Sequence, residues 1–347
     1  MHLSVLDQTP VPSGTTPAEA LANTVDLAQH AERFGYERYW LAEHHASGGL
    51  AGSVPEVLIA HVAAHTSTIR VGSGGVMLSH YSPLKVAEAF RMLETLHPGR
   101  IDLGLGRAPG SEPLTAFALQ RNRQHQNADD FVDQLAELVA WLDGAFPDQH
   151  PFSRITASPV PEASPDIWLL SSSGFSSAVA AHFGTGLCFA HFISDQGGPE
   201  SIADYKARFV PSRHHLEPAA AIGVGVICAD TNEQAKALAT SAALWRLRRR
   251  KGDNGPVPTV EEAAEHVWTG SDLLVAGPAA ARTIVGDQAT VKQELTELAA
   301  RYEVDDLVIV TITHDHAARV HSYALLAEAF DLSPGPTGLA VAEVAPV

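Results

Sequence analysis

Short apolar runs alternate along most of the chain with longer segments in which apolar residues recur at helical spacing. The short runs predict eight strands, at 3–8, 38–44, 69–78, 100–108, 166–173, 186–192, 221–229 and 306–313. The longer segments predict helices at 17–35, 55–66, 83–97, 129–143, 175–183, 200–210, 231–250, 291–302 and 315–330. Strands that alternate with helices are typical of a parallel sheet with right-handed crossovers. The count of eight favours an α/β protein whose sheet closes into a (β/α)8 TIM barrel.

Residues 1–332 are expected to form one barrel domain with two long insertions, at 144–165 and 251–290. Long insertions in such a barrel usually cover the active face or move over it, so we expect both near the carboxyl ends of the strands. The remaining segment, 333–347, is expected to be a weakly ordered tail.

Polar and glycine residues gather at the carboxyl ends of four successive strands, where a barrel of this kind carries its site. The second strand ends at His44, the third contains small residues at 72–75, the fourth ends at Arg107, and the fifth runs into serines at 171–177. The opposite rim shows no such gathering. These four strand ends are therefore predicted to form the functional site.

The serine run opens a predicted helix, and hydroxyl and free N–H groups at a helix N-terminus can bind an anion. Arg107 adds a forked cation that suits phosphate. The alternative is that the serines only cap the helix and that Arg107 pairs with a surface carboxylate. If a phosphate does bind here, a flat ring attached to it can lie over Gly74 and Gly75, where side chains would fill the space. A simple β-bulge is the alternative for the glycines.

His44 is a candidate general base, because imidazole titrates near neutral pH, although a histidine at a strand end is often only a packed residue. Asp7, His80 and Tyr81 also lie near predicted strand ends and are expected to line a substrate pocket with His44. No metal site is expected. Two pairs of histidines have a spacing that could suit a metal ion but lack further ligands: His61 with His65, and His314 with His316.

The net charge of −17 argues against a nucleic-acid partner, because such binding depends on cations that neutralise phosphates. The one basic run, "RLRRRK" at 246–251, is interpreted as the solvated end of a helix. Cys188 and Cys228 lie in strand-like runs and are expected to be buried free thiols. The sequence shows neither an apolar run of membrane-spanning length nor a secretory signal, so we expect a cytoplasmic protein with no membrane partner.

Four segments together resemble the bacterial luciferase-like flavin monooxygenases, over about residues 1–330 and in the right order. The segments are "RYWLAEHH", "VGSGGVMLSHYSPLKVAEAF", "HPGRIDLGLGRAPG" and "IWLLSSS". The likeness is to a single-chain subgroup, some of whose members act in natural-product pathways such as antibiotic biosynthesis. The resemblance implies a (β/α)8 barrel that binds reduced FMN and activates O2 to oxygenate a small organic substrate, such as a polyketide-type metabolite.

The resemblance also assigns roles to residues. It implies a non-proline cis peptide at Gly74–Gly75 beneath the flavin ring, and proton transfer by His44. The family's phosphate pocket matches four positions: Arg107, Ser172, Ser173 and Ser176. The chain departs from luciferase at Gly106, where a cysteine would stand, and at Ser172, where a glutamate would stand, so light emission is not expected.

The partners implied are a separate NAD(P)H:flavin reductase and a second copy of the chain in a homodimer. The reductase is expected because the sequence shows no second nucleotide fingerprint. Three alternatives stay open at this level. They are an F420-dependent hydride-transfer oxidoreductase, a non-catalytic flavin-binding protein, and an enzyme acting on sugar phosphates.

Overall fold

The computed structural model describes residues 1–107, 112–119 and 130–333. The strands of this part of the chain are β1 (His2–Asp7), β2 (Arg38–Leu41), β3 (Arg70–Ser73), β4 (Val76–Met77), β5 (Ile101–Gly106), β6 (Asp166–Ser171), β7 (Gly186–Ala190), β8 (Ala220–Cys228), β9 (Thr283–Gly286) and β10 (Asp306–Val310). The helices are α1 (Pro17–Phe34), α2 (Pro55–Ala64), α3 (Pro83–Leu96), α4 (Pro113–Leu119), α5 (Phe131–Asp143), α6 (Gly174–Phe183), α7 (Gly198–Arg208), α8 (Asn232–Arg250), α9 (Val260–Glu265), α10 (Gly270–Ala281), α11 (Gln288–Tyr302) and α12 (His316–Ala329), with a 3-10 turn at Leu78–His80.

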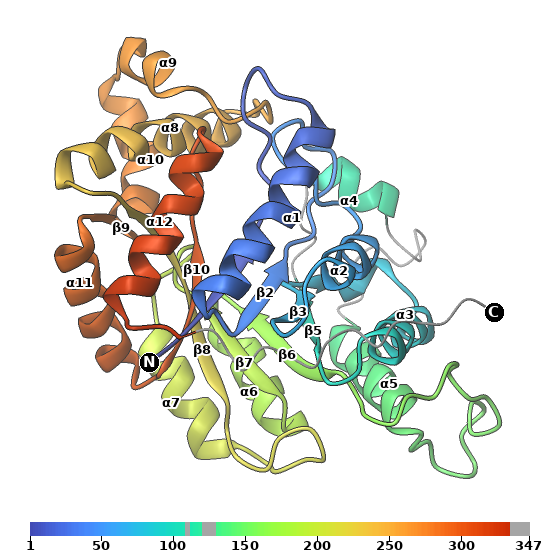
Figure 1. Cartoon of the computed structure of the whole chain (residues 1–347). Coiled ribbons are helices and arrows are strands. Elements are labelled where there is room, and N and C mark those ends of the chain that lie inside the picture. Colours follow the sequence, from blue (N-terminus) through green and yellow to red (C-terminus); the bar gives the residue numbers. More distant parts are fainter. Residues whose placement is uncertain (108–111, 120–129, 334–347) are drawn as a thin grey trace, which may run out of the picture.

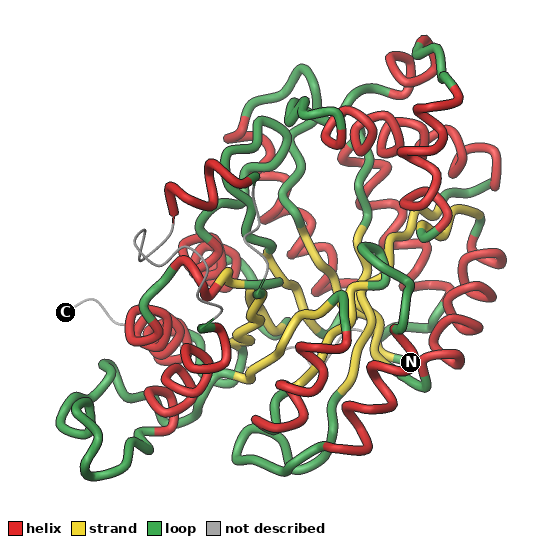
Figure 2. The backbone as a smooth tube through the Cα atoms, turned by 180° about the vertical axis from the view of Figure 1, so that it is seen from behind, coloured by secondary structure: helices red, strands yellow, loops and turns green. Residues whose placement is uncertain are grey.

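The strands form a closed parallel barrel, which confirms the TIM-barrel prediction. The order is β1, β2, β3, β5, β6, β7, β8 and β10, and β10 pairs with both β8 and β1 to close the ring. Figure 1 shows the helices surrounding the strands, and Figure 2 shows the strands gathered in the middle of the molecule. Strand β9 was not predicted; it pairs with Gly225–Cys228 at the carboxyl end of β8.

The helices and strands follow from local sequence. Helix α1 begins at a capping box, in which Thr16 and Glu19 each satisfy a backbone N–H of the other, and it ends at Gly35 in the left-handed conformation (φ 88°). All nine residues of β8 are buried, as expected for a barrel strand covered on both faces. Cys188 and Cys228 are buried and unbridged, as predicted. None of the helices in the described part of the chain combines the length and apolar character that a bilayer span requires.

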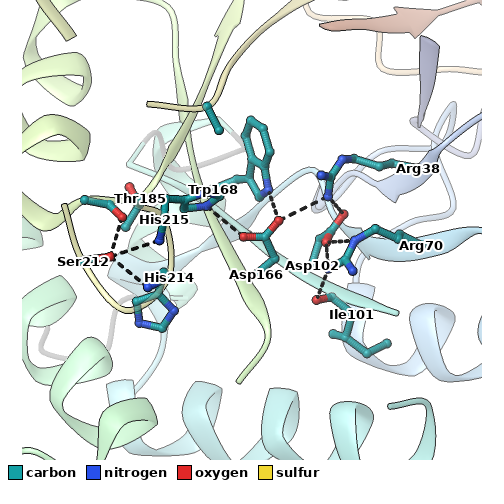
Figure 3. Close-up of polar contacts among 12 residues, drawn as sticks. Arg38, Arg70, Ile101, Asp102, Asp166, Trp168, Thr185, Ser212, His214 and His215 are labelled. Atoms are coloured by element: carbon teal, nitrogen blue, oxygen red, sulfur yellow. Dashed lines mark hydrogen bonds and ion pairs between the residues drawn. The ribbon is translucent and has the colours of Figure 1, made fainter. Parts of the chain in front are cut away.

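An ion network closes the amino end of the barrel (Figure 3). Arg38 at the start of β2 contacts the carboxylates of Asp102 at 2.8 Å and Asp166 at 3.3 Å, and Arg70 donates to Asp102 at 2.8 Å. Burial alone would raise the pKa of Asp166, but His215, at 2.8 Å, and Arg38 lower it to about 2. The prediction that this rim lacks a polar cluster was therefore wrong, because these charges are spread over separate segments of the sequence.

Two tryptophans separate this network from the upper part of the barrel. Trp40 donates to Asp102 at 2.8 Å and Trp168 to Asp166 at 3.0 Å, and their rings meet edge to face with centroids 5.4 Å apart. The indole bodies face an apolar cluster that includes Leu6, Cys188 and Val308. The barrel therefore has a charged base, an aromatic layer above it, and an apolar interior that leads to the carboxyl ends of the strands.

Only one of the two long insertions lies where it was expected. Segment 251–290 contains α9, α10 and β9, and β9 pairs with the carboxyl end of β8. Segment 144–165 leads from the end of α5 into the start of β6, so it reaches the amino face of the barrel, and Arg91 on α3 donates to its Ala157 carbonyl. Its predicted place near the carboxyl ends was wrong. Apart from Ser333, the predicted tail lies outside the described residues.

Candidate active site

A cavity of about 150 Å³ opens above the apolar interior, at the carboxyl ends of the barrel strands. Its wall brings together five residues that the sequence had singled out: His44, Gly74, Gly75, Arg107 and Ser172. Leu6, Trp40 and Val308 belong to its apolar lining. Residues from four different strand ends thus converge on one space, as the strand-end argument predicted.

The third barrel strand is interrupted between β3 and β4 by a cis peptide at Gly74–Gly75, the non-proline bond that the resemblance implied. A Cβ atom on Gly74 would lie 2.3 Å from Leu6 Cδ1, and one on Gly75 would lie 2.7 Å from the Gly104 carbonyl oxygen. A side chain at Gly75 would therefore meet the backbone of the neighbouring strand β5, whereas one at Gly74 would have to displace the Leu6 side chain. Both glycines lie in the cavity wall, and the expectation that they leave room for a flat ring stays a prediction.

Glu43 holds the segment after this peptide in place, and the sequence analysis did not select it. Its carboxylate is fully buried and accepts hydrogen bonds from the Met77 backbone N–H at 2.9 Å and from the Tyr81 hydroxyl at 2.7 Å. The His45 ring lies 2.7 Å from the same carboxylate. An acid that directly follows a buried strand, in "AEHH", was the available signal.

His44 presents a neutral imidazole to the cavity. Burial lowers its pKa to about 4, with smaller electrostatic contributions from Arg249 and His45. Its Nδ1 atom is buried and has no hydrogen-bond partner among the described residues, while its backbone N–H donates to the Gly52 carbonyl at 2.8 Å. The backbone of His44 is therefore held in place, and Nδ1 is a buried polar atom without a partner among the described residues, in a residue that lines the cavity.

Arg107 and the serine run meet at the start of α6. The Arg107 guanidinium lies over the Phe175 ring, 4.3 Å from its centroid. Ser173 is the N-cap residue, but its side chain makes no capping hydrogen bond, so the simple capping alternative does not describe it. Ser172 lines the cavity, whereas Ser173 and Ser176 are not among its lining residues; Ser173 is exposed and Ser176 is buried in the first turn.

The three residues assigned to a substrate pocket with His44 do not line the cavity. Asp7 is fully buried on the helix side of β1, where its carboxylate accepts from Tyr39 at 2.6 Å and Arg319 at 2.7 Å. Burial by itself would raise the pKa of Asp7, but Arg319 outweighs it and lowers that pKa. His80 and Tyr81 lie behind the cavity, beside Glu43 and His45. The cavity wall therefore gives no support to the assignment of these three residues to a substrate pocket, which stays a prediction.

One group in the described part of the chain places three possible metal ligands within 4.8 Å of one another, namely His2, Glu37 and Asp306. These residues start or precede barrel strands at the amino end, away from the cavity. This group does not include either of the histidine pairs that the sequence had suggested as metal ligands, His61 with His65 and His314 with His316. The expectation of no metal stays a prediction.

Comparison with known proteins agrees with this geometry. The family model for luciferase-like monooxygenases matches residues 1–303. The chain is 47% identical over 334 residues to the uncharacterized YwcH of Bacillus subtilis, covering 95% of this chain and 99% of that protein. It is 40% identical over 326 residues to a luciferase-like monooxygenase of Escherichia coli, covering 93% and 95%. The crystal structure of apo-MsnO8 superposes with a TM-score of 0.87 at 42% identity, covering 96% and 98%.

Three further proteins are relevant to chemistry. An N-acetyl-S-alkylcysteine monooxygenase of Bacillus subtilis is 38% identical over 337 residues, covering 95% of this chain and 98% of that protein. The oxygenating component of 3,6-diketocamphane monooxygenase from Pseudomonas putida, solved with FMN, shares the fold at 18% identity (TM-score 0.67, covering 96% and 98%). An F420-dependent secondary alcohol dehydrogenase shares it at 11% identity (TM-score 0.65, covering 94% and 98%). The matched family model and the full-length relatives show that the chain belongs to the bacterial luciferase-like monooxygenase family.

Proposed function

We propose that this protein is an FMN-dependent monooxygenase that uses reduced FMN and O2 to oxygenate a small organic substrate. The observation that carries the proposal is a single cavity lined by His44, by the backbone of Gly74–Gly75, and by Arg107 beside the start of α6. A phosphorylated planar cofactor fits these groups, because they offer a cation and a helix N-terminus at one end and an unpaired imidazole nitrogen at the other.

Each group has one task in this proposal. Arg107 and the N–H groups that begin α6 bind the FMN phosphate, with Ser172, Ser173 and Ser176 as hydroxyl donors nearby. The backbone at Gly74–Gly75 supports the isoalloxazine ring, and Glu43 keeps that backbone in place through Met77. The apolar lining formed by Leu6, Trp40 and Val308 keeps water away from the reacting atoms.

His44 is the proton-transfer group of the proposal. With a pKa of about 4 its ring is neutral at pH 7, so it can accept a proton from the bound substrate or cofactor and return it later. When bound, reduced FMN supplies the two electrons that allow one oxygen atom to enter the substrate while the other leaves as water. His44→Ala should therefore reduce product formation strongly while leaving FMN affinity nearly unchanged.

The proposal includes two partners. A separate NAD(P)H:flavin reductase supplies the reduced FMN, and a second copy of the chain forms a homodimer. Neither a polyketide-type substrate nor a role in antibiotic biosynthesis follows from the cavity, so both stay predictions.

The test is turnover with a flavin reductase, NAD(P)H, FMN and ¹⁸O2 in a metabolite extract of the source organism. We expect a product that carries one ¹⁸O atom and whose yield falls strongly when His44→Ala replaces the wild type. An anaerobic reaction that proceeds equally well with F420 in place of FMN would support the hydride-transfer alternative. Tight binding of oxidised FMN with no reductase-coupled turnover would support a non-catalytic flavin-binding protein.

A further inference from the structure

A second cavity, of about 470 Å³, adjoins the first and shares three lining residues with it: Gln8, Phe192 and Ile193. Its wall includes residues of α8, of the end of α10 and of the carboxyl ends of β8 and β10, on the opposite side of the barrel mouth from Arg107. Figure 1 shows α8, α9 and α10 gathered on this side of the molecule. A molecule in the second cavity would therefore extend toward His44 without crossing the proposed phosphate site.

The second cavity is lined by four arginines, although the protein carries a net charge of −17. They are Arg246, Arg249, Arg250 and Arg282. The basic run that supplies three of them was interpreted from the sequence as a solvated helix end. That interpretation was wrong for Arg246 and Arg249, which are only partly exposed and face the cavity.

Among the described residues, Arg246 and Arg249 have no acidic partner, and Arg282 has only a distant one. Arg246 donates to the Thr283 hydroxyl at 3.1 Å, and Arg249 lies over the Trp245 ring at 4.7 Å; within the described part of the chain neither forms an ion pair. Arg282 is 3.8 Å from the Asp195 carboxylate, and its Nε atom is buried without a hydrogen-bond partner. Burial and the nearby charge of Arg282 lower the pKa of Arg246 to about 10.

A structural role does not account for this arrangement. Placing like charges together away from water destabilises the folded protein unless an anion compensates them. Arg248, the one arginine of α8 outside the cavity wall, has an acidic partner of the usual kind, because it pairs with Glu262 at 2.8 Å. The rest of the cavity wall includes apolar side chains such as Phe192 and Ile312. The wall therefore suits a molecule with an apolar body and an oxyanion at one end.

We propose that Arg246, Arg249 and Arg282 form a carboxylate-binding site that orients an amphipathic organic acid as the substrate, with its apolar part directed toward His44. This inference deepens the proposed function, on which it rests. Arginine binds carboxylates through paired, charge-assisted hydrogen bonds, so three such side chains can fix one end of the substrate. The oxidised position would then be set by the distance between this anchor and the flavin.

The test is calorimetric titration of the whole chain with octanoate and with octanamide, its neutral isostere, in the absence of flavin. Wild type should bind octanoate about tenfold or more tightly than octanamide, which is the scale of a charge-assisted hydrogen bond. Arg249→Met and Arg246→Met should each remove most of this preference. Arg248→Met is the matched control on the same helix and should retain it.

Two further measurements separate this site from the flavin site and from a structural role. FMN affinity should be unchanged in Arg249→Met and weakened about tenfold or more in Arg107→Met. The melting temperature of Arg246→Met should equal or exceed that of wild type, because the substitution removes repulsion from Arg282.

Three results would overturn the inference: no preference for octanoate in wild type, an unchanged preference in Arg249→Met, or loss of FMN binding in Arg249→Met but not in Arg107→Met. The last result would mean that the arginines hold the flavin phosphate. Because the titration needs neither flavin nor O2, wild type that prefers octanoate but fails to incorporate ¹⁸O would refute only the proposed function.

Discussion

The depressed pKa of His44 makes the stability of the protein depend on pH in a predictable way. The pKa of this imidazole is about 4 in the folded chain, compared with 6.5 for an unperturbed histidine, chiefly because burial disfavours the charged ring. Between these values the unfolded chain binds a proton that the folded chain does not, so stability falls as the pH falls from 6.5 to 4. From pH 7.5 to pH 4.5 the loss of unfolding free energy due to His44 is about 2–3 kcal/mol.

The substitution His44→Gln should remove this loss. Urea unfolding followed by tryptophan fluorescence at both pH values gives the change in free energy of unfolding for each protein. Wild type should lose about 2–3 kcal/mol more than His44→Gln between pH 7.5 and 4.5. His182→Gln, at an exposed position on α6, is the matched control and should behave as wild type does. Equal losses in wild type and His44→Gln would refute the account of a neutral, buried imidazole.

Three other substitutions test separate parts of the structure. Arg107→Met should raise the Kd for FMN about 10- to 100-fold, measured by flavin fluorescence, with little change in melting temperature. Gly75→Ala should lower the free energy of unfolding by about 1–3 kcal/mol in urea titrations, because the new methyl group would lie 2.7 Å from the Gly104 carbonyl oxygen. Arg319→Met should lower the free energy of unfolding by about 3–5 kcal/mol in the same assay, because it leaves the Asp7 carboxylate buried without its cation. Asp7→Asn should leave FMN affinity unchanged.

Periodicity was sufficient to predict the eight barrel strands and their order, because each strand or helix of the barrel buries a regular apolar face. It was insufficient in segment 251–290. Helix α10 contains Gly277 and Pro278, both poor helix formers, and β9 is only four residues long. These elements are stabilised by packing against α8 and β8 rather than by local preference.

The sequence was sufficient to predict which strand ends form the site, but not in which direction each side chain points. Leu6 faces the cavity, so Asp7, the next residue on the strand, faces the helices, where partners distant in sequence surround it. The functional character of Arg246 was also hidden, because an arginine with an acidic partner and one without look the same in sequence. Only the tertiary structure shows that Arg248 has a carboxylate beside it and that Arg246 has none among the described residues.

A crystal structure of the complex with FMN is the most direct test of the central claim. The account predicts that the isoalloxazine ring lies against the backbone of Gly74–Gly75 and that its phosphate contacts Arg107 and the first turn of α6. A ring bound elsewhere, or a phosphate held by Arg246 and Arg249, would contradict it.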